Sequence, residues 1–135
     1  MPSYTALVTL LTVALYFSFA LRVAMARGKF GVPLPATSGN PDFERVFRVH
    51  QNTHEWLPIF LASLWVCALF LSDIGAAALG LLWLIGRVVY AIGYTKAVEK
   101  RLPGFFIQST ACFLLFLGGA FGVVGHLIGK QGLAP

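Results

Sequence analysis

Four long apolar stretches dominate the sequence and limit the folds open to it. A helix that crosses a hydrocarbon core of about 30 Å needs about 20 largely apolar residues. In a chain of 135 residues, 58% hydrophobic and only 11% charged, the stretches that qualify are 4–26, 43–71, 74–98 and 105–128. Because lipid offers no partners to backbone polar groups, each stretch is expected to be helical. The sequence therefore predicts an all-α, integral-membrane four-helix bundle.

The links between these stretches are too short to hold a soluble domain. They are a loop rich in Gly and Pro at 28–41, a tight turn at Ser72-Asp73, and a basic link that ends at Pro103-Gly104. The first stretch has no basic region before it and is long for a signal peptide, so we expect it to be retained as a span. We predict one four-span membrane domain over residues 1–135.

The basic residues follow a topological pattern. Four crossings place the first and third links on the same face, and the basic residues of that face are Arg27, Lys29, Arg45, Arg48, Lys96, Lys100 and Arg101. The other face has only Lys130. By the positive-inside rule the basic face is cytoplasmic, in a bacterial inner membrane or the endoplasmic reticulum. The net charge of +5 thus reflects topology, and no nucleic-acid partner is predicted.

The second stretch carries the first functional signal. Its clean apolar part, 56–71, is too short to cross alone, so the helix must extend back through Glu55 and Asn52 towards Arg48. An ionisable side chain near the bilayer centre costs at least about 2.5–3.5 kcal/mol. These polar side chains should therefore face the protein interior or a ligand cavity.

Two polar stripes arise when about 100° per residue is assigned to each helix. The stripe of the second span spreads over about 80° and that of the third over about 60°. Their members are Arg45, Arg48, Asn52 and Glu55 on the second span, and Arg87, Tyr90, Tyr94 and Arg101 on the third. Because almost no chain separates the two spans, they must be antiparallel neighbours. The stripes can line one cavity that opens at the basic face.

Arginine outnumbers acid in that cavity, where Glu55 is the one carboxylate. Arginine binds carboxylates bidentately, and a lone carboxylate can receive an ammonium group or neutralise an arginine. A zwitterionic peptide with an excess carboxylate fits both features. Two other interpretations stay open: Glu55 pairs with Arg87 or Arg48 in a structural network, or it is the proton-coupling carboxylate of a small four-helix transporter.

Other motifs receive structural interpretations. His50 and His54 could chelate a metal, but they lie away from the stripe and lack an evident third ligand, so no metal site is predicted. Tyr90 and Tyr94 could be interfacial belt residues, although they share a face with Arg87. A stripe of small residues on the fourth span predicts close helix packing; its members are Gly118, Gly122, Gly125 and Gly129.

The segment ERVFRVHQNTHE at 44–55 resembles the signature of the MAPEG family, the membrane-associated proteins of eicosanoid and glutathione metabolism. Arg87-x-x-Tyr90-x-x-Gly93-Tyr94 resembles the third-helix motif of that family, and the loop at 35–44 is similar to the branch of leukotriene C synthase and the microsomal glutathione transferases. The resemblance covers nearly the whole chain. It implies a homotrimer with glutathione bound between neighbouring subunits near the cytoplasmic face.

The resemblance also implies a role for each site residue. Arg101 occupies the position of the arginine that stabilises the glutathione thiolate. The residues that would hold or shape the glutathione site are Arg27, Arg48, Asn52, Glu55, Tyr90 and Tyr94, together with His50, Trp56 and Arg87. The thiolate would attack a lipophilic electrophile, or reduce a lipid hydroperoxide, that arrives from the membrane lipid.

Three departures from the leukotriene-synthesising members bear on specificity. Gly28 stands where they have a second arginine, Phe106 where they have a tyrosine, and His50 where glutamine is common. We therefore expect a general glutathione transferase with peroxidase activity, and not a dedicated leukotriene synthase. Because the family also holds proteins that bind lipophilic ligands without evident catalysis, a lipid-binding accessory protein stays an alternative.

Overall fold

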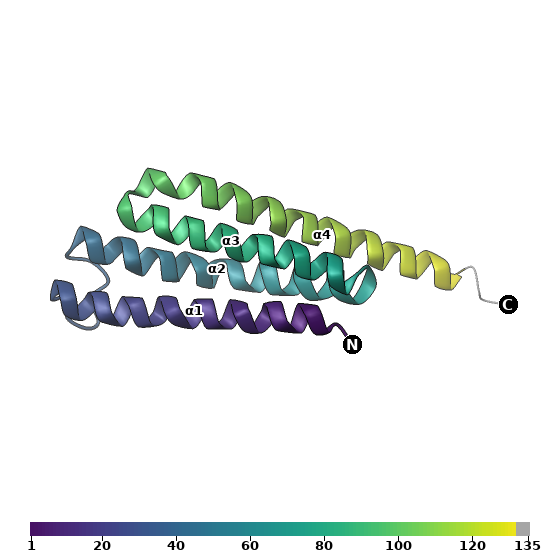
Figure 1. Ribbon diagram of the computed structural model, residues 1–135, viewed down its shortest axis with the longest axis horizontal. Helices are drawn as coiled ribbons and strands as arrows, with labels where there is room; N and C mark the ends of the chain where they lie inside the picture. The colour runs from purple at the N-terminus through teal and green to yellow at the C-terminus, as the bar shows by residue number, and fades with distance from the viewer. Residues whose placement is uncertain (132–135) are drawn as a thin grey trace.

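Four long helices run side by side along the length of the molecule (Figure 1). The computed structural model describes residues 1–131, with side chains described to residue 129. The elements in chain order are α1 (Ser3–Phe30), α2 (Pro41–Phe70), α3 (Asp73–Lys96), the 3-10 helix η1 (Val98–Arg101) and α4 (Leu102–Gln131). The predicted all-α, four-helix architecture is confirmed, and all four long helices are long and apolar enough to span a membrane.

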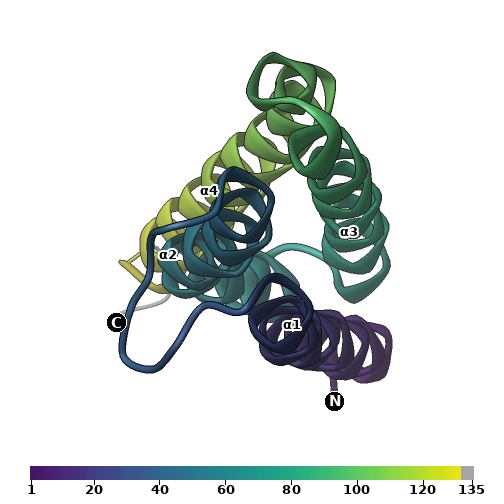
Figure 2. The ribbon, with the colours of Figure 1, turned by 90° about the vertical axis from the view of Figure 1, so that its left-hand side faces the viewer.

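The first and last long helices both pack on the two middle helices. α1 packs on α2 and α3, and α4 packs on α2 and α3 from another side. Figure 2 shows this arrangement from the end that carries the α1–α2 loop and the α3–α4 link. We call this end the basic end, because the predicted basic links lie there, while the N-terminus and the α2–α3 turn lie at the opposite end.

Local chemistry determines where each helix begins and ends. α1 continues through Gly28 to Phe30 and stops at Gly31, whose left-handed φ of 65° lets its N–H bond back to Arg27. The Asn40 side chain caps α2 by accepting from two backbone N–H groups, with Pro41 in the first position. The loop is therefore shorter than expected from the sequence.

The α3–α4 link also differs from the expected boundary. Pro103 and Gly104 lie in the first turn of α4, which begins three residues earlier than predicted, at Leu102. Proline is tolerated there because the first N–H groups of a helix have no intrahelical partner. As a result η1 and the start of α4 turn tightly and place Arg101 beside the end of α3.

The core lies between α2, α3 and α4, and the outer surface is apolar. Phe60 and Trp83 stack with ring centroids 3.9 Å apart, and both are fully buried. Large exposed apolar side chains cover the outside, among them Leu10, Phe17 and Phe121, which are 62–73% exposed. Such a surface suits lipid, and together with the four spans it makes the chain an integral membrane protein.

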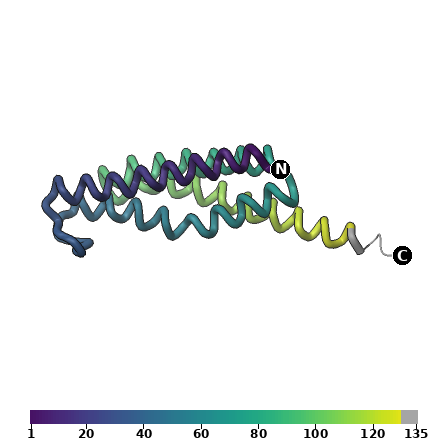
Figure 3. Tube along the Cα trace, turned by 90° about the horizontal axis from the view of Figure 1, so that it is seen from below, coloured from purple at the N-terminus to yellow at the C-terminus, as the bar shows by residue number. Residues whose placement is uncertain are grey.

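The final part of α4 extends past the other helices (Figures 1 and 3). The glycine stripe divides accordingly. A Cβ at Gly118 or Gly122 would lie within 3.1 Å or 2.6 Å of atoms of α2, so these glycines allow close packing. A Cβ at Gly125 or Gly129 would meet nothing within 4 Å. The packing interpretation therefore holds within the chain for the first pair.

Candidate functional site

A pocket of about 260 Å³ lies at the basic end, between α2, α3 and the start of α4. Its lining residues are Asn52, Glu55, Trp56, Tyr90, Arg101, Leu102 and Phe105. Five of these were predicted as site residues. Trp56 and Phe105 meet edge to face, with ring centroids 6.2 Å apart, and give the pocket an apolar wall.

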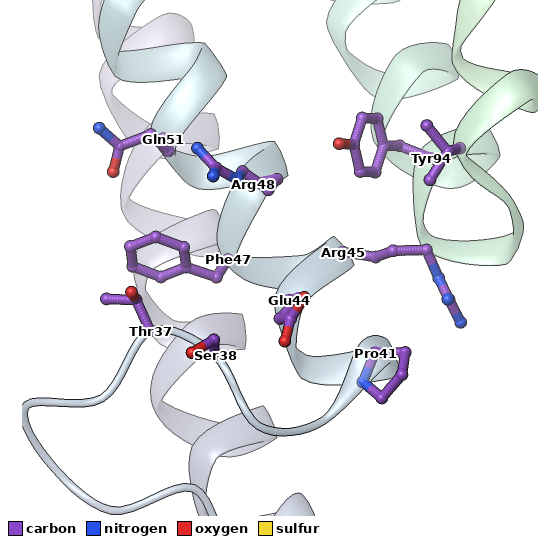
Figure 4. A pocket seen from close by; sticks show the side chains of 10 residues that line it. Thr37, Ser38, Pro41, Glu44, Arg45, Phe47, Arg48, Gln51 and Tyr94 are labelled. Carbon is purple, nitrogen blue, oxygen red and sulfur yellow. The ribbon is translucent and has the colours of Figure 1, made fainter.

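A second pocket, of about 540 Å³, lies next to the first (Figure 4). Arg48 and Tyr94 line it, each one helical turn nearer the basic end than Asn52 and Tyr90 of the first pocket. Figure 4 shows Arg48 on α2 and Tyr94 on α3 on facing walls. The other lining residues are Thr37, Ser38, Pro41, Glu44, Arg45, Phe47, Gln51 and Val98. We call the two pockets together the groove.

The groove contains charges that have no ionic partner among the described residues. Within residues 1–129, the only ion pair joins Arg45 to Asp42, and Arg45 also donates to the carbonyl of Thr95 at 3.2 Å. Arg48 and Glu55 are exposed, and Arg101 lies over the Tyr94 ring, 5.6 Å from its centroid. The groove therefore offers two free guanidinium groups and one free carboxylate.

Neutral polar groups lie between these charges. The Asn52 amide donates to the Tyr90 hydroxyl at 2.7 Å. Since that oxygen accepts from Asn52, the Tyr90 O–H remains free to donate to a ligand. The Tyr90 and Tyr94 rings lie 5.5 Å apart, and both residues are buried. The alternative belt role for these tyrosines does not match their burial between helices.

Arg87 lies behind the groove. It is fully buried and donates to the Gln108 side-chain oxygen, to the Thr53 hydroxyl and to the Val49 carbonyl. Its guanidinium lies 4.3 Å from the centroid of the Tyr90 ring. Arg87 therefore contacts the back of Tyr90, and in the described chain it forms no ion pair with Glu55. The structural ion-pair network considered from the sequence is absent from residues 1–129.

Gln108 and Thr53 had not been identified from the sequence as part of this arrangement. Both are buried, and together with the ring of Tyr90 they surround the Arg87 guanidinium. The one signal available was that a buried arginine requires several acceptors. A glutamine inside the fourth apolar stretch was the candidate to supply one.

Arg27 and His50 lie outside the groove of their own chain. Arg27 donates to the carbonyls of Val32, Pro33 and Ala36, at 3.3, 3.2 and 2.7 Å, and so folds the loop against the end of α1. His50 stacks on Tyr16 of α1, with ring centroids 4.8 Å apart. The structure brings neither residue to the other predicted site residues.

His54 belongs to the same α1–α2 contact. Its Nδ1 lies 3.1 Å from the Tyr16 hydroxyl. Among the residues that the structure describes, no group of three His, Cys, Asp or Glu side chains gathers as a metal site would require. The histidine pair therefore connects two helices on the side away from the groove.

Two glycines let the groove close tightly around Tyr90 and Arg101. A Cβ at Gly93 would lie 2.0 Å from the carbonyl oxygen of Lys100, and a Cβ at Gly104 would lie 2.1 Å from the backbone nitrogen of Tyr90. Any side chain at these positions would push η1 and α4 away from α3. Gly93 belongs to the third-helix motif, but its packing role was not evident from sequence.

The fold and the groove define a four-span membrane protein that has free arginine and glutamate side chains, among the described residues, in a groove at one end. Residues 5–121 match the MAPEG family, and the chain belongs to that family. It is 44% identical over 124 residues to the uncharacterized protein sll1147 of Synechocystis sp., covering 92% of this chain and 90% of the relative.

Two named relatives match at similar levels. Microsomal glutathione S-transferase 2 of Homo sapiens is 40% identical over 123 residues, which cover 91% of this chain and 84% of the relative. Leukotriene C4 synthase of Rattus norvegicus is 42% identical over 123 residues, covering 91% and 82%. The predicted family is therefore confirmed.

Proposed function

We propose that the protein is a membrane-bound glutathione transferase that binds glutathione in the groove. The observation that carries the proposal is the set of unpartnered charges there, Arg48, Arg101 and Glu55. Glutathione has two carboxylates, one ammonium and one thiol, so its charges complement this set. Relatives named as a glutathione S-transferase and a leukotriene C4 synthase support the same substrate.

The tripeptide uses both pockets. Glu55 receives the α-ammonium group, while Arg48 binds a carboxylate at the exposed mouth. Asn52, Tyr90 and Tyr94 supply neutral hydrogen bonds between the charges. Arg87 positions Tyr90 from behind through its contact with the ring. The lining of the groove by Arg48, Asn52, Glu55, Tyr90 and Tyr94 supports these roles.

Arg101 stabilises the thiolate. A free thiol with a pKa near 8.5 is mostly protonated at neutral pH, whereas the thiolate is the nucleophile. A guanidinium beside the sulfur favours the charged form, and each unit of pKa lowering corresponds to about 1.4 kcal/mol. Arg101 lines the same pocket as Asn52 and Glu55 and has no ionic partner among the described residues.

The second substrate is a lipophilic electrophile from the membrane. Trp56, Leu102 and Phe105 line the pocket beside Arg101 and give an apolar surface for it. The thiolate forms a C–S bond to the electrophilic carbon, and the bonding electrons leave with a departing group or an opened epoxide oxygen. With a lipid hydroperoxide, two glutathione molecules give a disulfide, an alcohol and water.

The complete site is formed in a homotrimer, with the groove opening towards the cytoplasm. Arg27 and His50 do not reach the groove of their own chain, although the family resemblance gives both a part in binding glutathione. A neighbouring subunit supplies these side chains in the proposed assembly. The position of the groove at the basic end supports the cytoplasmic orientation.

Equilibrium dialysis tests the proposal, using protein in lipid nanodiscs and two ligands. The first ligand is glutathione, and the second is the analogue that lacks the α-amino group. We expect saturable binding of glutathione, clearly weaker binding of the analogue, and conjugation of glutathione to a lipophilic aryl halide. Failure of glutathione to bind would contradict the proposal and leave a lipid-binding or transport role for the groove.

A further inference from the structure

Arg22 is a charged residue inside the first apolar span, and the proposed reaction does not use it. It lines a pocket of about 510 Å³ between α1, α2 and α3, whose other lining residues are Met25, Ala26, Lys29, Phe30, Asp42, Val46 and Thr95. Val46 and Thr95 follow Arg45 and Tyr94 of the groove directly in sequence. This pocket therefore lies on a different face of α2 and α3 from the groove.

The depth of Arg22 in the membrane follows from α1 itself. α1 begins at Ser3, and 20 residues at about 1.5 Å each bring the helix to Arg22 after roughly 30 Å. That length matches the hydrocarbon thickness of a bilayer. Arg22 thus lies where the hydrocarbon ends and the phosphate groups of the basic-end leaflet begin. Lys29 lies two turns further out on the same face of α1.

The pocket has positive charge without a partner. Within residues 1–129, neither Arg22 nor Lys29 pairs with a carboxylate. The one acid in the lining, Asp42, is already bound by Arg45. An anion in the pocket would therefore meet two free cations.

The remaining walls are apolar. Met25 is 73% exposed, and Phe30 and Val46 are half-buried. A soluble anion would leave these side chains uncovered, whereas a phospholipid headgroup with its glycerol covers them. The two cations and the apolar side chains lie together at the membrane boundary, which is the depth of a lipid headgroup.

We propose that this pocket is a binding site for the headgroup of one anionic phospholipid, with its phosphate between Arg22 and Lys29. The site is separate from the glutathione groove, but Arg45 connects them, because it binds Asp42 of the lipid pocket and lines the groove. The lipid is a structural ligand of the basic end and takes no part in the chemistry.

Native mass spectrometry of the detergent-solubilised protein tests the site. The protein is incubated with phosphatidylglycerol, with phosphatidylcholine of the same acyl chains, or with inorganic phosphate. The variants are Arg22→Ala/Lys29→Ala and, as a matched control, Lys100→Ala, which removes an exposed cation at the same end outside the pocket. Glutathione binding by each variant reports that the fold is intact.

We expect one phosphatidylglycerol per chain to be retained in preference to phosphatidylcholine. Loss of both cations should weaken retention about thirtyfold, since each basic residue near an anionic lipid contributes about a fivefold effect. Lys100→Ala should retain the lipid. Equal loss in both variants would show general surface attraction and overturn the site. Competition by inorganic phosphate at equal concentration would show a soluble-anion site and overturn the lipid proposal.

Discussion

Asp73 at one end of the bundle and the charged residues of the groove at the other end differ in whether they have partners. At the end with the α2–α3 turn, Asp73 accepts hydrogen bonds from the backbone N–H groups of Tyr4 and Thr5, at 3.1 and 2.8 Å, so its charge ties α3 to the start of α1. At the basic end, Arg48, Arg101 and Glu55 have no ionic partner among the described residues. Asp73 at the first end serves the fold, whereas these three charges at the second end are available to a ligand.

This difference indicates where stability and function are separable. Charged groups are costly to hold near a membrane without partners, so their persistence in a groove points to a bound ligand as the missing partner. The middle of the bundle, with Phe60 stacked on Trp83, supplies packing between the two ends. Substitutions at the two ends should therefore affect different measurements.

Arg101→Ala should have the largest effect. If Arg101 lowers the pKa of the bound thiol by about two units, from about 8.5 to about 6.5, the thiolate fraction near pH 7 falls about 25-fold without it, and the conjugation rate falls in proportion. The rate rises with pH as the thiol ionises, so the midpoint of this rise should move up towards 8.5 in the variant. A pH–rate profile measures both, with Lys100→Ala as the control; an unchanged midpoint would contradict the role.

Gly93→Ala should have the next largest effect. The added Cβ would lie 2.0 Å from the Lys100 carbonyl oxygen, so η1 must shift and carry Arg101 with it. We expect the conjugation rate to fall about tenfold or more, because misplacement of a catalytic group by about 1 Å can cost up to 100-fold. Gly125→Ala, at an open position on α4, is the matched control. Equal activity of the two variants would show that the close approach of η1 is unimportant.

Glu55→Gln should weaken glutathione binding about tenfold, equivalent to about 1.4 kcal/mol, because it removes the charge that receives the ammonium group. The analogue without the α-amino group should bind both proteins equally. Equilibrium dialysis with the two ligands measures this coupling. If both ligands lose the same affinity in the variant, Glu55 does not contact the ammonium group.

Asp73→Asn should have the smallest effect on the groove and should lower the thermal midpoint by a few degrees, because it weakens the bonds to Tyr4 and Thr5. Glutathione affinity should stay unchanged. Thermal unfolding followed by circular dichroism, together with dialysis, checks both parts. A loss of glutathione affinity would show that Asp73 also affects the groove at the other end, against this expectation.

The four spans and the groove could be predicted from particular residues. Apolar runs of sufficient length leave few choices in a membrane, and Asn52 and Glu55 had to face away from lipid. Helical periodicity then placed them on the same face as Arg48. These steps depend on spacing within one helix, which the sequence specifies directly.

The positions of Arg87 and Arg27 could not be predicted in the same way. Arg87 shares an arc with Tyr90, but an arc of about 60° on α3 covers both the side that lines the groove and the side that packs on α4. Its partner Gln108 lies on another helix, so the contact between them could not be inferred from spacing within α3. Arg27 folds onto the loop carbonyls, such as that of Ala36, because α1 continues past the expected boundary. Both depend on tertiary packing.

The most direct test of the central claim is ultraviolet difference absorbance of the nanodisc protein titrated with glutathione near neutral pH. We expect a saturable thiolate signal of the bound ligand that disappears in Arg101→Ala and persists in Lys100→Ala. If glutathione binds and no thiolate forms in the unaltered protein, or if the signal survives the loss of Arg101, the claim that this groove activates glutathione is wrong.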